Sequence, residues 1–244
     1  MDNSFGRNLD QTGQHYMIDS TLIKFIVNSA ELEKDDIVLE IGYGKGALTK
    51  ELAKKCKVIA IDIEENKFDV KNVIFIKDNI LNVFPKLYET YAFNKIVANI
   101  PYNISEPLIK LIFKQHKELE SVVLTIGKNF ATLLTSNDNR IGIIAKHIYD
   151  VELLKSVKPR SFSPPPSVDS EVILFEPKSD ALSDMYSKLV LLDDRKLKNA
   201  MEKIFADKTK RQVKELTKHS LFEKKLYELS NKEFLELDNI LREL

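Results

Sequence analysis

The sequence predicts an α/β fold with a mostly parallel, seven-stranded sheet, followed by a small all-helical domain. Two observations carry this prediction. In the first two-thirds of the chain, short β-branched runs alternate with amphipathic helical patterns, which is typical of βαβ units. Residues 181–244 contain neither glycine nor proline, and their leucines recur at helical spacing. We therefore expect one domain over residues 1–176 and a second over residues 177–244.

Seven runs are candidate strands. Two of them flank the proline-rich turn at residues 163–166, and no long helix fits between them, so we expect an antiparallel pair at one edge of the sheet. The other five are each followed by a turn-forming Gly, Pro, Asp or Asn. In chain order, the seven runs are Ile37–Ile41, Val58–Ile63, Val73–Lys77, Asn94–Ala98, Ser121–Thr125, Val151–Val157 and Glu171–Phe175.

Composition limits the classes of function. Hydrophobic residues make up 43% of the 244, enough for a sizeable core, and 37 basic side chains balance 37 acidic ones. Any nucleic-acid surface must therefore be a local patch. The single cysteine, Cys56, allows neither a disulfide within the chain nor a metal cluster built on cysteines. No apolar run approaches the roughly 20 residues that span a bilayer, and the N-terminus lacks an apolar signal core. We expect a soluble, cytosolic protein with no membrane partner.

A glycine-rich turn follows the first predicted strand. Gly42, Gly44 and Gly46 form G-x-G-x-G, which lets the backbone turn tightly and approach a ligand closely. Glu40, just before the glycines, would repel phosphates but tolerate a cationic, phosphate-free ligand such as S-adenosylmethionine (SAM). The alternative is a plain tight turn between a strand and a helix.

Two acids end the next two predicted strands. Asp62 is placed to bind a ribose hydroxyl pair, and Asp78 to accept a hydrogen bond from the adenine amino group of the cofactor. Either acid alone could instead cap a helix. Because ligands bind at the carboxyl ends of strands in open α/β sheets, the turn and both acids together favour a cofactor site.

The tetrapeptide Asn99-Ile-Pro-Tyr102 follows the fourth predicted strand. Adenine N6 is a poor nucleophile, and two acceptors aimed at its N–H bonds would stabilise the positive charge that develops during attack. The Asn99 side chain and the Ile100 carbonyl supply such acceptors, Pro101 fixes the backbone, and Tyr102 offers a stacking face. The alternative is a turn that ends a strand.

These motifs resemble the KsgA/Erm family of rRNA adenine N6-methyltransferases over nearly the whole chain. The resemblance adds an N-terminal segment similar to the family's G-Q-[NH]-F-L-x-D, a segment similar to F-x-P-x-P-x-V-x-S, and a stretch resembling the basic F-x-x-[RK]-[RK]-K segment of the small domain. In this sequence they are Thr12–Asp19, Phe162–Ser170 and Phe205–Val213.

The resemblance implies a Rossmann-like, class I SAM-dependent methyltransferase domain and assigns roles by position. His15 and Met17 would contact the cofactor, and Phe162 would stack on the target adenine opposite Tyr102. Without the resemblance, Phe162 would be expected to be a core residue beside the proline-rich turn. Gly42 would line the methionine part of SAM, Gly44 would also bind the cofactor, and Asn99 would sit between cofactor and target. No metal is implied.

The small domain begins with a basic stretch. From Arg195 to Lys218 there are nine Lys or Arg against three acids. This stretch is either a solvated helix face or an RNA-binding surface. We expect the second, with phosphate contacts from Arg195, Lys208, Lys210 and Arg211.

Two branches of the family remain open. The long N-terminal match and Val168-Asp-Ser170 favour the KsgA branch, which dimethylates adenines in small-subunit rRNA. Asn99-Ile-Pro-Tyr-Asn103 instead matches the Erm branch, which modifies large-subunit rRNA and confers macrolide resistance. We favour the first, with an assembling small ribosomal subunit as partner and the chain as a monomer. Departures from the KsgA pattern leave the RNA geometry open; they lie at Gly127, Asn129, Leu133 and Asn139–Arg140.

Two other readings compete. A DNA adenine methyltransferase would need a sequence-reading domain, for which the residues after Glu176 are too few and too plain. A non-catalytic nucleic-acid-binding factor on the same fold would not need to keep the cofactor and amide positions. All of these positions are kept here, which favours an enzyme.

Overall fold

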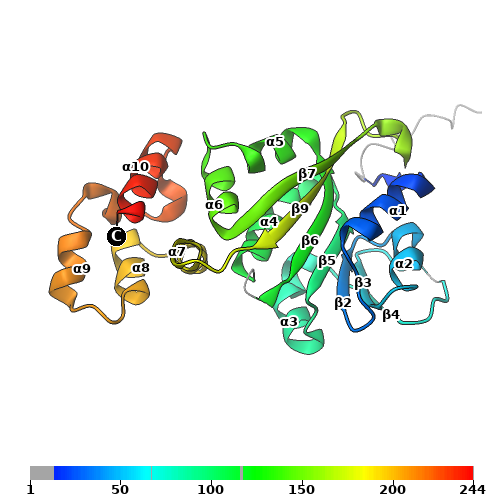
Figure 1. The fold of residues 1–244 in the computed structure, drawn as a ribbon, viewed down its shortest axis with the longest axis horizontal. Coiled ribbons are helices and arrows are strands. Elements are labelled where there is room, and N and C mark those ends of the chain that lie inside the picture. The colour runs from blue at the N-terminus through cyan, green and yellow to red at the C-terminus, as the bar shows by residue number, and fades with distance from the viewer. Residues whose placement is uncertain (1–13, 67, 116–117, 244) are drawn as a thin grey trace, which may run out of the picture. The chain divides into compact units, whose positions relative to one another are not determined.

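The computed structural model describes residues 14–66, 68–115 and 118–243. Its main sheet has seven strands in the order β4-β3-β2-β5-β6-β9-β7 (Figure 1). The first five are parallel, and β9 runs antiparallel to β6. The predicted mostly parallel sheet is therefore confirmed, with its last two strands together at one edge. The strands are β2 Ile37–Ile41, β3 Lys57–Asp62, β4 Val73–Lys77, β5 Lys95–Asn99, β6 Ser121–Gly127, β7 Tyr149–Val157 and β9 Ser170–Pro177.

Helices follow β2, β4, β5 and β6, as βαβ units require, whereas β3 leads to its parallel neighbour β4 without a helix in the described residues. Side-chain oxygens cap α1 and α3 at the N-terminus: Asp19 accepts from the N–H groups of Thr21 and Leu22, and Asn79 from that of Leu81. These caps satisfy backbone donors that have no partner inside a helix. The helices before the last strand are α1 Ser20–Ser29, α2 Ala47–Leu52, α3 Ile80–Tyr91, α4 Ser105–Lys114, α5 Lys128–Thr135 and α6 Arg140–Ile148, with short 3₁₀ turns at Tyr102–Ile104 and Pro159–Ser161.

The strand order creates a switch point between β2 and β5. Successive strands after β2 are added on one side of it, and β5 and β6 on the other. In the register, Ile41 lies opposite Ala98, so the residues that follow β2 and end β5 meet at the same edge. Ligands of open α/β sheets bind in the crevice at such a point.

A second, two-stranded sheet joins β1 (Tyr16–Met17) to β8 (Phe162–Ser163) in antiparallel register. The N–H of Ile18 extends this pairing by donating to the carbonyl of Ser161 at 2.9 Å. The pairing was not predicted from sequence, because runs of two residues carry no periodicity. It fixes the N-terminal segment beside Phe162.

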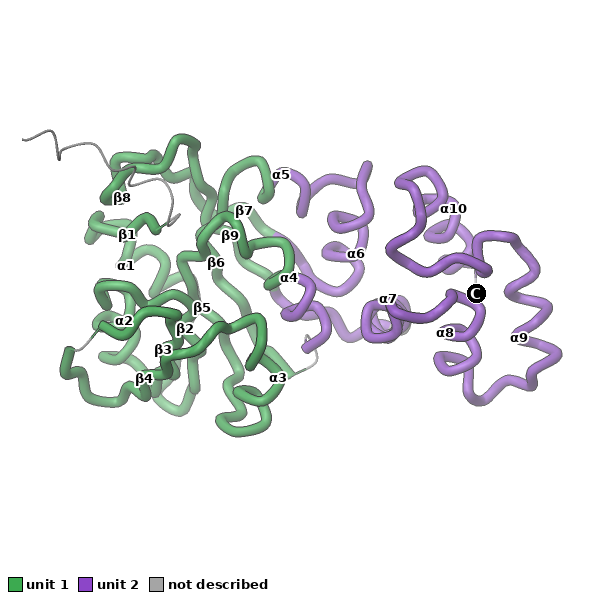
Figure 2. The backbone as a smooth tube through the Cα atoms, turned by 180° about the vertical axis from the view of Figure 1, so that it is seen from behind, with its two compact units in different colours: residues 1–109, 118–131, 152–175 green, residues 110–117, 132–151, 176–244 purple. Residues whose placement is uncertain are grey.

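The chain forms two compact units, coloured separately in Figure 2. Unit 2 comprises residues 110–117 and 132–151 as well as the C-terminal part from residue 176. The expected boundary at residues 176/177 differs from this division because α6 belongs to unit 2. Within unit 2, Nε2 of His147 in α6 lies 2.7 Å from Oδ1 of Asp238, to which the Tyr186 hydroxyl donates at 2.6 Å. Sequence gives no sign of this buried polar contact.

From residue 181 on, the described elements are helices, as predicted, with one isolated β-bridge between Lys196 and Lys225. Helix α6 is an earlier segment of the same unit, and the two residues at its N-terminal end make defined contacts. Asn139 caps it by accepting from the Gly142 N–H at 3.0 Å, and Arg140 donates to the carbonyl of Tyr227 at 2.8 Å. This departure from the family pattern is thus engaged within unit 2. The elements are α7 Ala181–Leu191, α8 Leu197–Ile204, α9 Lys210–Leu216, α10 Asn231–Arg242 and the 3₁₀ helices Ser220–Glu223 and Leu226–Glu228. Over the described ranges, no helix has the length and apolar character needed to cross a membrane.

Candidate cofactor and target-base site

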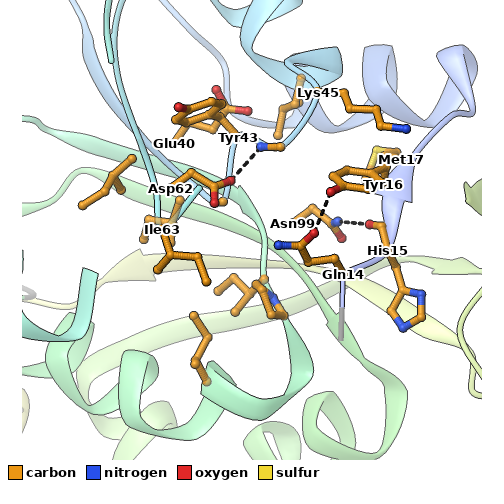
Figure 3. A pocket seen from close by; sticks show the side chains of 18 of the residues that line it. Gln14, His15, Tyr16, Met17, Glu40, Tyr43, Lys45, Asp62, Ile63 and Asn99 are labelled. Carbon is orange, nitrogen blue, oxygen red and sulfur yellow. Dashed lines mark hydrogen bonds between the residues drawn. The ribbon is translucent and has the colours of Figure 1, made fainter. Parts of the chain in front are cut away.

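A cavity of about 540 Å³ opens in unit 1 at the carboxyl ends of β2, β3 and β5 (Figure 3). The structure brings together around it every residue that the sequence predicts for the cofactor and the target base. These lining residues are His15, Met17, Gly42, Gly44, Asp62, Asp78, Asn99, Ile100, Pro101, Tyr102 and Phe162.

The glycine turn is required by both backbone and space. Gly44 has φ +48°, and a Cβ there would lie 2.9 Å from the ring of Tyr16. Lys45 places its Nζ 4.6 Å from the centroid of the same ring. The N-terminal segment therefore lies directly on the turn, and a side chain at position 44 would displace it.

Two carboxylates face this turn and the cavity. Oδ2 of Asp62 accepts from the Gly44 N–H at 2.8 Å, and Oδ1 from the Glu64 N–H at 3.0 Å. Asp78 is exposed and accepts from the N–H of Asn79, which itself caps α3. Neither acid is therefore a helix N-cap, the alternative that the sequence left open.

Glu40 lies beneath the turn with only 1% of its surface exposed. Its Oε2 has no hydrogen-bond partner among the described residues, and burial raises the pKa of this carboxyl to about 8. A buried carboxylate is stabilised when a cation lies close to it. With Asp62 and Asp78 nearby, the cavity fits a cationic, phosphate-free ligand such as SAM.

The raised pKa of Glu40 predicts how stability depends on pH. Between its ordinary pKa and about 8, the folded chain holds a proton that the unfolded chain has lost. Unfolding therefore becomes easier as pH rises through this window. Denaturant unfolding at a series of pH values should show this slope in the wild type and a flatter one in Glu40→Gln. Equal slopes in the two proteins would mean that Glu40 is ionised in the folded state.

The Asn99 amide has a defined orientation. Its Nδ2 donates to the backbone carbonyl of His15 at 3.0 Å (Figure 3). Because a carbonyl only accepts, the nitrogen must face His15, which leaves Oδ1 free to accept elsewhere. The next residue, Ile100, is anchored by its N–H to the Thr125 carbonyl at 3.0 Å. Pro101 then holds an extended backbone with φ −56° and ψ 133°. The site thus presents an oriented amide oxygen beside a rigid backbone.

The two aromatic residues predicted to hold the base differ in exposure. Tyr102 is half-buried, with its hydroxyl 2.8 Å from Oγ of Ser170. Phe162 is only 3% exposed and packs in the hydrophobic core while also lining the cavity. Its ring is therefore a wall of the cavity supported by the core, with little free surface for a base to cover.

Sequence reasoning missed three isoleucines that line the cavity. Ile63, Ile80 and Ile104 line the cavity, and Ile63 is 61% exposed. An exposed isoleucine directly after a cavity carboxylate offers a flat surface for a planar ring. Its position beside Asp62 was the available signal.

The four residues predicted to bind RNA lie in unit 2 and are all exposed. Lys210 and Arg211 begin α9, Lys208 precedes it, and Arg195 precedes α8. Some neighbouring lysines are neutralised: Lys196 and Lys198 pair with Glu223, and Lys218 with Glu215. Across the described part of the stretch, no ion pair engages Arg195, Lys203, Lys208, Lys210, Arg211 or Lys214.

Comparisons with known proteins identify the family of the chain. A family model described as ribosomal RNA adenine dimethylase matches residues 7–239. The chain is 31% identical over 256 residues to a probable ribosomal RNA small subunit methyltransferase A of Pyrococcus abyssi, covering 96% of this chain and 92% of that protein. It is 37% identical over 179 residues to the protein of the same name in Methanopyrus kandleri, covering 69% of this chain and 63% of that one. A crystal structure of a dimethyladenosine transferase from Plasmodium falciparum superposes with a TM-score of 0.62 at 26% identity, covering 94% of this chain and 98% of that one.

Proposed function

The chain belongs to the ribosomal RNA adenine dimethylase family, and from this premise we propose that it dimethylates adenine N6 in small-subunit rRNA with SAM as methyl donor. The observation that carries the proposal is the orientation of Asn99, whose amide nitrogen is held by the His15 carbonyl. The oxygen is thereby directed as an acceptor beside a cavity suited to SAM. The names of the relatives in Pyrococcus abyssi and Methanopyrus kandleri support the small subunit as target.

Different residues around the cavity would bind different parts of the cofactor. SAM supplies a methyl group on a positively charged sulfur. Asp62 would hold the ribose, and Asp78 the adenine amino group, with Ile63, Ile80 and Ile104 against the adenine ring. His15, Met17, Gly42 and Gly44 would line the methionine part.

Replacing Asp62 by alanine should weaken SAM binding about tenfold or more, because a charge-assisted hydrogen bond contributes roughly 1.5–3 kcal/mol. The same change removes the acceptor of the Gly44 N–H, which donates to the Asp62 carboxylate in the wild type. Titration calorimetry measures the affinity, with Asp35→Ala as the control, since Asp35 is exposed and does not line the cavity. Equal SAM affinity in Asp62→Ala and the wild type would contradict the assignment.

At the target base, this chain's residues would stabilise the developing positive charge and would not abstract a proton before attack. Asn99 Oδ1 and the Ile100 carbonyl would accept hydrogen bonds from the two N6–H groups. These hydrogen bonds favour a pyramidal nitrogen and offset its growing positive charge. Tyr102 and Phe162 would hold the ring. The N6 amine is not acidic before attack, so a general base has little to contribute to that step. Once N6 has taken the methyl group it is cationic, and it then releases a proton to solvent.

The exposed cations of unit 2 would bind the RNA backbone. Reversing the charges of Lys208, Lys210 and Arg211 together should lower the affinity for RNA. It should also make that affinity less dependent on salt, because fewer counterions are released on binding. SAM affinity should not change. The matched control reverses the charges of three exposed lysines of unit 1, Lys55, Lys57 and Lys71. RNA affinity and salt slope like those of the control would leave the stretch as a solvated face.

Phosphate contacts carry no sequence information, so target choice would rest on RNA shape. We therefore propose an assembling small ribosomal subunit as the partner and a monomer as the acting form. Mass spectrometry of both rRNAs after incubation with the chain and labelled SAM tests the proposal. Dimethyladenosine in the small-subunit rRNA is the expected result. Label only in the large-subunit rRNA would indicate Erm-type activity, and no label would favour a non-catalytic binding factor.

A further inference from the structure

The motif Val168-Asp-Ser170 has no role in the site described so far. Its last residue, Ser170, begins β9 and is fully buried. Its Oγ lies 2.8 Å from the hydroxyl of Tyr102. A buried serine therefore holds the far end of the ring on which the target base is proposed to stack.

The same rung of the sheet supports the body of that ring. In the register of β6 and β9, Gly127 lies directly opposite Ser170. A Cβ built on Gly127 would lie 3.4 Å from Cδ1 of Tyr102, which is ordinary van der Waals contact, so the ring packs beside this position of β6. Paired residues of two neighbouring strands thus contact the ring at its side and at its hydroxyl.

On a third side, the ring of His15 lies with its centroid 5.8 Å from that of Tyr102, at an interplanar angle of 36°. The Nδ1 atom of His15 is itself 2.9 Å from the carbonyl of Pro164. Because a stacking platform is useful only if its plane is fixed before the base arrives, these contacts have a functional consequence.

We propose that Ser170 is a positioning residue for methyl transfer, which fixes the plane of Tyr102 through their shared hydrogen bond. Gly127, opposite Ser170 in the sheet, packs beside the same ring. Ser170 does not touch the base and acts through Tyr102. The inference rests on the base-holding role proposed for Tyr102.

The competing view is that Ser170 and Tyr102 only satisfy each other's polar groups in the fold. Single-turnover methyl transfer at saturating SAM and undermethylated small ribosomal subunits separates the two views. Ser170→Ala and Tyr102→Phe remove the same bond from opposite ends. Ser121→Ala is the matched control, because its Oγ is buried on the neighbouring strand without a partner among the described residues.

We expect Ser170→Ala and Tyr102→Phe each to lower the rate per folded molecule about three- to tenfold, the equivalent of one hydrogen bond. The double variant should be no slower than either single variant, and SAM affinity should match that of Ser121→Ala. A rate per folded molecule in Ser170→Ala equal to that of Ser121→Ala, while the wild type is active, overturns this inference alone. Independent, multiplying effects in the double variant also overturn it. A wild type without methyl transfer overturns the proposed function together with the inference.

Discussion

Replacing Asn99 by alanine is expected to slow single-turnover methyl transfer by about 10²–10³-fold, the usual effect of removing an acceptor or donor that matters most in the transition state. The structure supports this magnitude because the amide is oriented before any base arrives, by the bond from Nδ2 to the His15 carbonyl. The N6 amine gains positive charge during attack, so the lost oxygen costs more there than in the ground state.

The measurement is the rate at saturating SAM and RNA, with SAM affinity determined separately. Asn28→Ala is a suitable control, because Asn28 is an exposed residue of α1 that does not line the cavity. At saturating SAM, no side chain that would contact the target base should control the rate between about pH 6 and 9, since no general base is proposed. Glu40, whose pKa is raised to about 8, lies on the cofactor side of the cavity and should act on SAM affinity. Wild-type methylation by Asn99→Ala would make the mechanism wrong.

The variant Asn99→Asp tests whether an acceptor oxygen is enough, or whether the hydrogen bond that orients it is also needed. Retention of an acceptor alone would predict partial activity. The structure predicts less, because the aspartate loses the Nδ2 donor and sets a carboxylate against the carbonyl of His15. Protonation of that carboxyl would restore a donor, so the defect should ease as pH falls. A rate for Asn99→Asp well above that of Asn99→Ala at pH 8 would show that the bond to His15 is dispensable.

The sequence predicted the sheet well because its signals were local. The bounds of β2 and β4 match the predicted runs, each a β-branched segment closed by a Gly or Asp signal. The fourth predicted strand shifts by one residue, from Asn94–Ala98 to Lys95–Asn99. The reason is pairing: Asn99 lies opposite Thr125 in β6, so the sheet holds the residue that the sequence assigned to the following turn.

Features that depend on distant parts of the chain were not predictable in the same way. The pairing of Met17 with Phe162 joins segments that are far apart in sequence and too short to show alternation. The contact between His147 and Asp238 places α6 in the same unit as α10, against the linear boundary expected near residue 176. The resemblance anticipated the lining residues of the cavity, but not the burial of Phe162.

That burial makes Phe162→Leu the second decisive experiment. The ring is 3% exposed and sits in the core, so its loss should lower the melting temperature. It also lines the cavity opposite the proposed base, and stacking on an aromatic face contributes about 1–3 kcal/mol per base. We therefore expect the single-turnover rate per folded molecule to fall about fivefold or more, with SAM binding much less affected.

Phe84→Leu isolates the core contribution, because Phe84 is 1% exposed in α3 and does not line the cavity. It should lower the melting temperature and leave the rate per folded molecule unchanged. If Phe162→Leu behaves in the same way, Phe162 is a core residue whose position beside the base carries no stacking. If Phe162→Leu loses rate beyond this control, the buried ring must expose a face when RNA binds. Since β8 holds that ring through its pairing with β1, the opening would then involve the N-terminal segment that also orients Asn99.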